Sequence, residues 1–311
     1  MNTTIVCGEG TRVWQRRRLS SSQSTGATAD YDAALSIMLQ NASLEATPGQ
    51  IAKNRDLGTL LPPGTSVYIP YLPGTNLADT IAAAPALIAQ GFHPVPHIPA
   101  RTLVSEAELD DSLGKLASDG VDTVLLIAGD TTPPAGPFPS TLEILETGLL
   151  ERHGIKRVAV AGHPEGHPNA DRDELDRAMR AKSDYAQKTG IEMWLVTQFI
   201  FDTDALLGWE QSLRDKGFDL PIRVGLPGPA KLRTLLNYAM QCGVSASARM
   251  LAKRPSSMRL LGRWAPDDMV HALARLKAEQ GDTSLIQDLH IYPFGGLTHA
   301  ADWLQQLKPD Q

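Results

Sequence analysis

Residues 122–127 read Asp-Thr-Val-Leu-Leu-Ile, a run with almost no alternation between apolar and polar side chains. Such a run is typical of a strand in a parallel sheet that helices cover. Helix-like stretches flank it at residues 105–117 and 141–153, and Ser105 is a candidate N-cap of the first. The sequence around this run therefore predicts a repeating unit of one buried strand and one helix.

The same alternation extends along the chain in both directions. We expect strands at residues 42–46, 66–71, 95–98, 122–127, 157–161, 193–199, 222–226 and 286–294. We expect helices at residues 75–90, 105–117, 141–153, 173–188 and 204–216, with helical text over 230–279. Eight strands alternating with helices indicate an α/β protein, a single (β/α)8 barrel of the TIM type. A doubly wound sheet is the rival, but no Gly-x-Gly-x-x-Gly follows a strand.

The first forty residues differ from the rest. Three arginines, residues 16–18, precede residues 20–29, a stretch of Ser, Thr, Gly and Ala with almost no core-forming side chain. This composition is typical of an extension or mobile loop, and no apolar segment of a secretory signal follows the arginines. We expect residues 1–40 to be an N-terminal extension and residues 41–311 to form the barrel domain.

Composition excludes several classes of protein. Acidic residues outnumber basic ones by 35 to 29, which argues against a mainly electrostatic partner of nucleic acid. No apolar run is long enough to span a membrane. The two cysteines, Cys7 and Cys242, cannot build a disulfide scaffold and fit a reducing cytoplasm. The chain therefore reads as a cytoplasmic protein with a small-molecule ligand, and a homo-oligomer is compatible with it.

In a (β/α)8 barrel the chemistry lies at the carboxyl ends of the strands. Glu45 stands there in the first strand, within the text Ser-Leu-Glu-Ala-Thr-Pro at residues 43–48. A carboxyl group among apolar residues is costly to ionise, so it tends to hold its proton. Glu45 is therefore a candidate general acid, and a salt-bridged residue without chemistry is an equal alternative.

The third and fourth strands end in His97-Ile-Pro-Ala-Arg and Ala128-Gly129-Asp130. A small residue and a glycine let a ligand approach the backbone, and the aspartate offers an acceptor to ring N–H groups. Asp130 is therefore a candidate binding residue, with a helix-capping turn residue as its alternative.

The fifth and sixth strands also end in polar text. The fifth ends in the loop Gly-His-Pro-Glu-Gly-His-Pro at residues 162–168, in which His163 and His167 could bind a metal if His97 supplied a third ligand. A loop that binds an anionic or polar cofactor is the stronger interpretation. Gln198, after the sixth strand, can donate and accept hydrogen bonds to a heterocyclic amide. Phe199 and Phe201 offer stacking faces, and at least one of them is expected in the core.

Taken together, SLEATP, HIPAR, AGD, GHPEGHP and TQFIFD resemble the 5,10-methylenetetrahydrofolate reductase family in order and spacing. The resemblance runs from about residue 42 to residue 230 and continues more weakly beyond. It implies a (β/α)8 barrel with non-covalent FAD, which NADH or NADPH reduces. Hydride from the flavin then converts methylenetetrahydrofolate to 5-methyltetrahydrofolate, a reaction of one-carbon metabolism and methionine biosynthesis.

The resemblance also implies roles for individual residues. Glu45 matches the acid that protonates folate N10, Asp130 matches an aspartate beside the flavin and the pterin, and Gln198 matches a pterin contact. Phe199 and Phe201 would lie on the substrate side. The cofactor-binding set would be Tyr71, His97, Ala128, Gly129, Asp130, His163, Glu165, His167 and Lys182.

At three positions the residue differs from the one that is usual in the family. Pro70 stands where many members have a threonine, Ala128 where some have an arginine, and His163 where a tyrosine is usual. Residues 292–296 (Tyr-Pro-Phe-Gly-Gly) also lack the family's arginine. A reductase that transfers hydride directly without flavin is therefore an alternative. Further alternatives are a metal-dependent barrel hydrolase or lyase that uses His97, His163 and His167, and a binding-only relative.

A cluster of basic residues has two interpretations, a binding site for the glutamate tail of folate and a solvated helix face. It comprises Arg249, Lys253, Arg254, Arg259 and Arg263.

Overall fold

The computed structural model describes residues 21–54, 56–72, 74–167, 170–244 and 263–308, and the side chains from residue 28 onward. Eight strands close a barrel in the order β1-β10-β7-β6-β5-β4-β3-β2. They are β1 (Ser43–Glu45), β2 (Ser66–Ile69), β3 (His93–Pro99), β4 (Thr123–Ile127), β5 (Arg157–Gly162), β6 (Glu192–Thr197), β7 (Ile222–Pro227) and β10 (Ile286–Tyr292). Every neighbouring pair is parallel, which confirms the (β/α)8 barrel predicted from the sequence.

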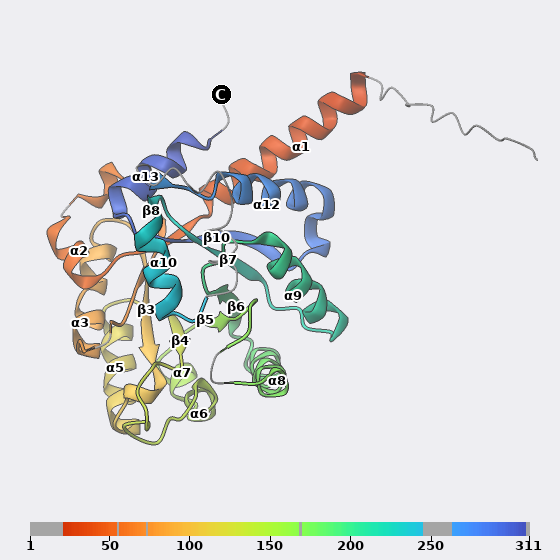
Figure 1. Cartoon of the computed structure of the whole chain (residues 1–311). Helices are drawn as coiled ribbons and strands as arrows, with labels where there is room; N and C mark the ends of the chain where they lie inside the picture. Colours follow the sequence, from red (N-terminus) through yellow and green to blue (C-terminus); the bar gives the residue numbers. More distant parts are fainter. Residues whose placement is uncertain (1–20, 55, 73, 168–169, 245–262, 309–311) are drawn as a thin grey trace, which may run out of the picture.

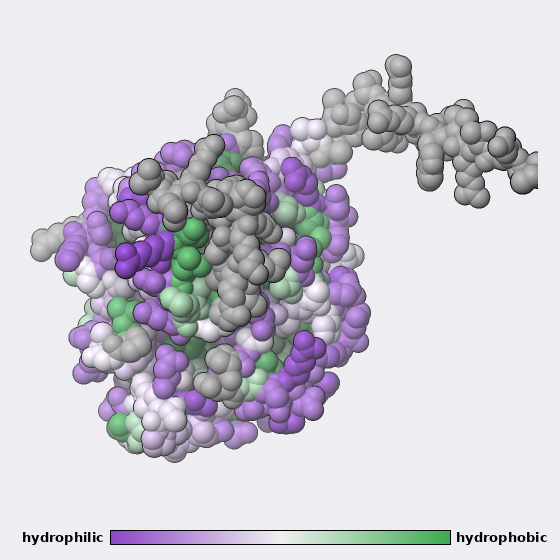
Figure 2. Space-filling model, in the orientation of Figure 1, coloured by the Kyte–Doolittle hydropathy of each residue, from purple (hydrophilic) through white to green (hydrophobic). Residues whose placement is uncertain are grey.

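Helices surround this barrel (Figure 1). They are α1 (Ser21–Gln40), α2 (Pro48–Lys53), α3 (Leu77–Ala82), α4 (Ala84–Ile88), α5 (Glu106–Ser118), α6 (Thr141–Glu146), α7 (Leu149–Arg152), α8 (Arg172–Thr189), α9 (Thr203–Asp215), α10 (Leu232–Gln241), α12 (Asp267–Gln280) and α13 (Leu297–Gln306). Short 3-10 turns lie at Leu57–Thr59, Ala100–Thr102 and Gly281–Thr283. The apolar core lies between the outer faces of the strands and these helices. The surface in view is mostly hydrophilic, with small hydrophobic areas (Figure 2).

Two helices that the sequence predicts as single are divided. Residues 75–90 form α3 and α4, because Pro85 lies in the first turn of α4 and cannot continue the hydrogen bonding of α3. Residues 141–153 form α6 and α7, because Gly148 between them has a φ of 69°. Ser105 caps α5 through the backbone N–H of Glu108, as predicted.

The sequence predicts an extension or a mobile loop at residues 20–29; the loop alternative is wrong, because α1 is helical from Ser21 to Gln40. The second half of α1 packs against α12, and Leu35 and Met38 are buried in the core. Tyr31 contacts His271 of α12 with 2.6 Å between the hydroxyl oxygen and Nδ1. The apolar residues that anchor the helix therefore lie beyond the Ser/Gly-rich text on which the prediction depended.

A small antiparallel pair, β8 (Ala230–Lys231) with β9 (Arg263–Trp264), was not predicted. Residues 245–262 lie outside the described part of the chain, and they include all of the predicted basic cluster except Arg263.

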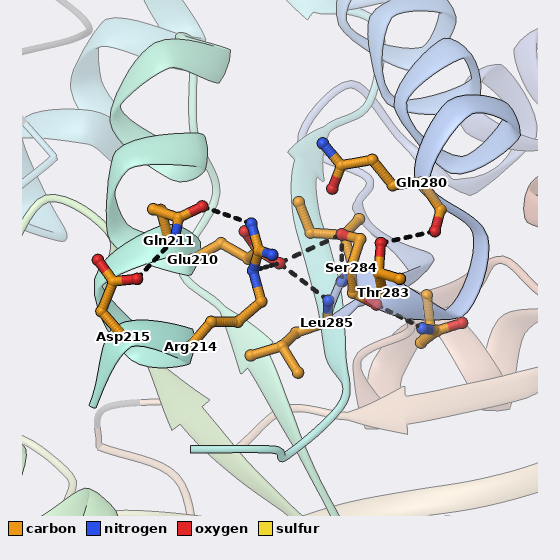
Figure 3. Close-up of polar contacts among 10 residues, drawn as sticks. Glu210, Gln211, Arg214, Asp215, Gln280, Thr283, Ser284 and Leu285 are labelled. Carbon is orange, nitrogen blue, oxygen red and sulfur yellow. Dashed lines mark hydrogen bonds and ion pairs between the residues drawn. The ribbon is translucent and has the colours of Figure 1, made fainter. Parts of the chain in front are cut away.

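One buried carboxylate ties a helix to the start of the last barrel strand (Figure 3). Glu210 of α9 is 2% exposed and accepts hydrogen bonds from the Leu285 N–H (2.9 Å) and the Ser284 hydroxyl (3.3 Å). Arg214, one turn along α9, places its Nε 3.0 Å from the same carboxylate oxygen. These contacts hold the end of the barrel opposite to the carboxyl ends of the strands.

Candidate active site

Glu45 ends β1 and faces the inside of the barrel mouth. Leu44 points the other way, into the core beneath the helices, because neighbouring residues of a strand face opposite sides. Thr47 then begins α2 with a capping box, in which its hydroxyl and backbone N–H pair with Gln50. This turn ends the strand at Glu45 and leaves the carboxyl group, 17% exposed, at the rim.

Two buried imidazoles flank the Glu45 carboxyl group. Its Oε1 lies 3.7 Å from Nε2 of His97 on β3 and 3.9 Å from Nε2 of His290 on β10. Burial lowers the pKa of His97 to about 4, although the charge of Glu45 opposes the shift. Burial also lowers the pKa of His290, again opposed by Glu45. Both rings are therefore neutral at neutral pH, and each presents one N–H and one acceptor nitrogen.

Aromatic and charged side chains form the floor beneath these rings. Tyr68 lies edge-on to His290, with ring centroids 4.4 Å apart, and its hydroxyl accepts a hydrogen bond of 3.0 Å from Trp194 Nε1. The guanidinium of Arg223 stacks on Trp194 at 4.5 Å from the ring centroid, and its Nε lies 3.8 Å from Asp288. The barrel interior is thus polar well below the mouth.

Sequence reasoning missed this floor and missed His290. The signal was present in the last strand, where Asp288, His290 and Tyr292 recur at every second position and so share one face. The pattern of alternating polar residues inside an otherwise buried strand marks the face that points into the barrel.

Asp130 lies on the opposite side of the mouth and is exposed. Gly129 before it has a φ of 80°, and a Cβ there would lie 3.2 Å from Pro99 Cβ, so the turn requires glycine. Burial raises the pKa of the Cys242 thiol to about 11, and the charges of Asp130 and Glu45 add to that shift. Both carboxylates therefore face the same thiol at the end of α10.

The predicted histidine loop forms a second polar cluster beside β5. The rings of His163 and His167 lie 4.8 Å apart, and Glu165 lies between them in the turn. Burial, with His167 and Lys182 nearby, lowers the pKa of His163 to about 4. Burial alone lowers the pKa of Lys182 to about 8. Burial also lowers the pKa of His167, and the negative charge of Asp130 opposes that shift, so this cluster lies near the mouth of the barrel.

The remaining predicted residues are placed less centrally. Gln198 is half-buried and its Oε1 accepts from the Phe199 N–H at 3.0 Å. Phe199 and Phe201 are buried at 1% and 3% exposure and pack edge-on to each other. Tyr71 lines a pocket of about 340 Å³ with Thr102 and Glu108, away from Glu45. Ala128 is half-buried, and its carbonyl accepts from the Arg101 N–H.

The predicted metal triad does not come together. Among the described residues, no three His, Cys, Asp or Glu side chains converge in a way that could hold a metal ion. His97 lies inside the barrel with Glu45, whereas His163 and His167 lie in the loop after β5. The metal-dependent alternative is therefore not supported by the geometry.

The loop cluster does fit the anionic part of a dinucleotide cofactor. Lys182 and the two imidazoles all carry lowered pKa values, and no described charge offsets the shift at Lys182. A bound pyrophosphate would supply the missing negative charge. Pro70 at the tip of β2 offers neither a hydroxyl nor an N–H, so the fit rests on the loop and α8.

No helix in the described part of the chain is long and apolar enough to cross a membrane.

A closed parallel barrel with an acid, neutral imidazoles and a buried lysine of α8 near the carboxyl ends of its strands has the architecture of a barrel enzyme. The family model described as Methylenetetrahydrofolate reductase matches residues 72–294. The chain therefore belongs to the methylenetetrahydrofolate reductase family.

Curated relatives are distant. The chain is 25% identical over 233 residues to 5,10-methylenetetrahydrofolate reductase of Pectobacterium carotovorum, covering 71% of this chain and 72% of the relative. It is 29% identical over 160 residues to a probable methylenetetrahydrofolate reductase (NADH) of rice, covering 47% of this chain. The matched region spans only 26% of that plant protein. Dihydropteroate synthase of Thermus thermophilus, at 12% identity, covers 86% of this chain and 92% of its own, with a TM-score of 0.44, too low to carry an argument.

Proposed function

We propose that this chain reduces 5,10-methylenetetrahydrofolate to 5-methyltetrahydrofolate with hydride from NADH or NADPH. The observation that carries the proposal is the Glu45 carboxyl group between two neutral imidazoles at the mouth of a barrel of this family. Such a group can hold a proton beside a bound substrate and deliver it to a nitrogen. The proposal includes a cytoplasmic location, which stays a prediction.

Glu45 would give its proton to folate N10, so that the five-membered ring of the substrate opens. Asp130, exposed at the facing rim, would accept hydrogen bonds from ring N–H groups of the pterin, and Gln198 would pair with the amide edge of that ring. Phe199 and Phe201 are buried in the core beside Gln198. They would reach the substrate only if the segment after β6 rearranged.

The loop after β5 would hold FAD through His163, His167 and Lys182, with Glu165 in the same turn. FAD, when bound, supplies the site with a hydride acceptor and donor between the nucleotide and the folate. Gly129 allows its ring to approach the backbone, while Ala128, His97 and Tyr71 stay predicted contacts.

The first test is the visible absorption spectrum of the full chain, recorded before and after NADH or NADPH is added without oxygen. Flavin peaks that bleach and return when methylenetetrahydrofolate is added, with 5-methyltetrahydrofolate as product, are the expected result. Lys182→Gln should lose flavin, whereas Lys188→Gln, near the end of the same helix, is the matched control.

A flavin-free reductase is the second candidate, favoured by the buried Pro70, which offers the cofactor no hydroxyl. A colourless protein that still forms 5-methyltetrahydrofolate from NADH would establish it. A protein that forms no 5-methyltetrahydrofolate with either nucleotide, with or without added FAD, would overturn both candidates.

A further inference from the structure

Ser43 lies in the interior of the barrel and has no role in the chemistry proposed above. Ser43 is fully buried, and β1 pairs with β10 so that Ser43 lies beside His290. Its hydroxyl lies 2.9 Å from Nδ1 of His290 and 3.3 Å from the carbonyl oxygen of Leu289. The first distance is that of an ordinary hydrogen bond and the second that of a long one, and the hydroxyl has only one proton to donate.

The carbonyl decides which way the proton points. Leu289 O can only accept, so the Ser43 hydroxyl satisfies both contacts only if it donates to the carbonyl and accepts from Nδ1–H. His290 then carries its proton on Nδ1, and Nε2 is left with a lone pair. That lone pair faces Glu45, whose Oε1 lies 3.9 Å from Nε2.

We propose that Ser43 and His290 are positioning residues for the acid: Ser43 holds His290 in the Nδ1–H tautomer, and the Nε2 lone pair then accepts a hydrogen bond from the Glu45 carboxyl group when that group carries a proton. The neutral carboxyl group gains an acceptor, while a carboxylate at the same place would meet a second lone pair. This inference rests on the proposed function for its catalytic meaning.

The other groups that face this pair do not supply the same control. His97 reaches Glu45 from β3, but its Nε2 has no hydrogen-bond partner and no described group fixes its tautomer. The remaining titratable or charged neighbours, by element, are Tyr68 on β2, Arg223 on β7, Asp288 and Tyr292 on β10 and Cys242 after α10. Burial raises the pKa of both tyrosines and of the thiol, so these three stay neutral, whereas Arg223 is paired with Asp288, 3.8 Å from its Nε.

The tautomer is measured directly by NMR of the full chain with ¹⁵N-labelled histidine, with the His290 signals assigned through His290→Gln. The expected result is Nδ1–H in the wild type and a change to Nε2–H in Ser43→Ala, because Nδ1–H loses its acceptor while Nε2–H gains Glu45. Ser112→Ala, a buried serine of α5, is the matched control and should leave the tautomer unchanged. An Nε2–H tautomer in the wild type would overturn the proposal, whatever the protein catalyses.

The catalytic consequence is read from the pH profile of folate reduction. In Ser43→Ala the pH at which activity falls to half on the alkaline side should drop by about one unit, the size expected for exchange of one hydrogen bond to a charged group. Reaction with NADH or NADPH alone should keep its rate, and Ser43→Thr should restore the profile. A Ser43→Ala variant that folds and keeps the wild-type profile would overturn the positioning role.

Failure of the proposed function is distinguishable from failure of this inference. A wild-type chain that never reduces methylenetetrahydrofolate refutes the reductase, whereas a wild-type chain that does so with an unchanged Ser43→Ala profile refutes only the role of Ser43.

Discussion

His97 makes the barrel sensitive to acid, and the effect can be isolated by substitution. The residue is 7% exposed, and burial lowers its pKa from 6.5 to about 4. Between these two pH values the unfolded chain takes up a proton that the folded chain cannot accept. The folded state is therefore favoured above pH 6.5 and loses stability as the pH falls toward 4.

The size of the loss follows from the shift. A difference of about 2.5 pKa units at 1.36 kcal/mol each gives about 3 kcal/mol in full, of which about 2.5 kcal/mol is lost by pH 4.5. His163 and His290, whose pKa values burial also lowers, add to the acid sensitivity of the wild type. Only the difference between the wild type and a variant at residue 97 reports on His97 itself.

The assay is urea unfolding at pH 7.5, 6.5, 5.5 and 4.5 for the wild type, His97→Gln and His93→Gln. His93 begins the same strand and is exposed, so its replacement controls for loss of a histidine. The free energy of unfolding of His97→Gln should fall less than that of the wild type by about 2.5 kcal/mol between pH 7.5 and 4.5. Equal pH dependence in all three proteins would refute a neutral, buried His97.

Three further predictions concern the acid, the lower end of the barrel and the strands beneath the mouth. Glu45→Gln should slow folate reduction by about 10²–10⁴-fold while reaction with NADH or NADPH keeps its rate; parallel loss of both in stopped-flow measurements would make Glu45 structural. Glu210→Ala should lower the free energy of unfolding by about 3–5 kcal/mol in urea, because it strands Arg214 and the Leu285 N–H, and Glu210→Gln should cost less. Gly225→Ala should cost about 1–3 kcal/mol, because the added Cβ would lie 2.3 Å from Thr197 O; a wild-type melting temperature would show that β6 and β7 separate freely.

The barrel was predictable because its strands are local and apolar. Runs such as residues 122–127 and 157–161 carry their own signal, and all eight expected strands are present within a few residues. The divided helices and α1 were not predictable in the same way. Pro85 and Gly148 act on single turns inside otherwise helical text, and α1 depends on packing against α12.

The candidate site was predictable only in part. Glu45, His97 and Asp130 follow from their places at strand ends, and their contribution to catalysis stays a prediction. The partner of Glu45 was not predictable, because His290 lies 247 residues from Ser43 and only the register between β1 and β10 brings them together. The tautomer proposed for His290 depends on that register and on the Leu289 carbonyl.

The seam between β1 and β10 is short, since only Ser43–His290 and Leu44–Ile291 are paired across it. One of those pairs contains His290, which lies beside the acid, so pairing of β1 with β10 both closes the barrel and completes the site. A nascent or clipped chain that stops before residue 290 can neither complete this pairing nor place His290 beside Glu45. Under the proposed function such a chain would not reduce folate. A ligand that contacts both β1 and β10 would stabilise the whole barrel.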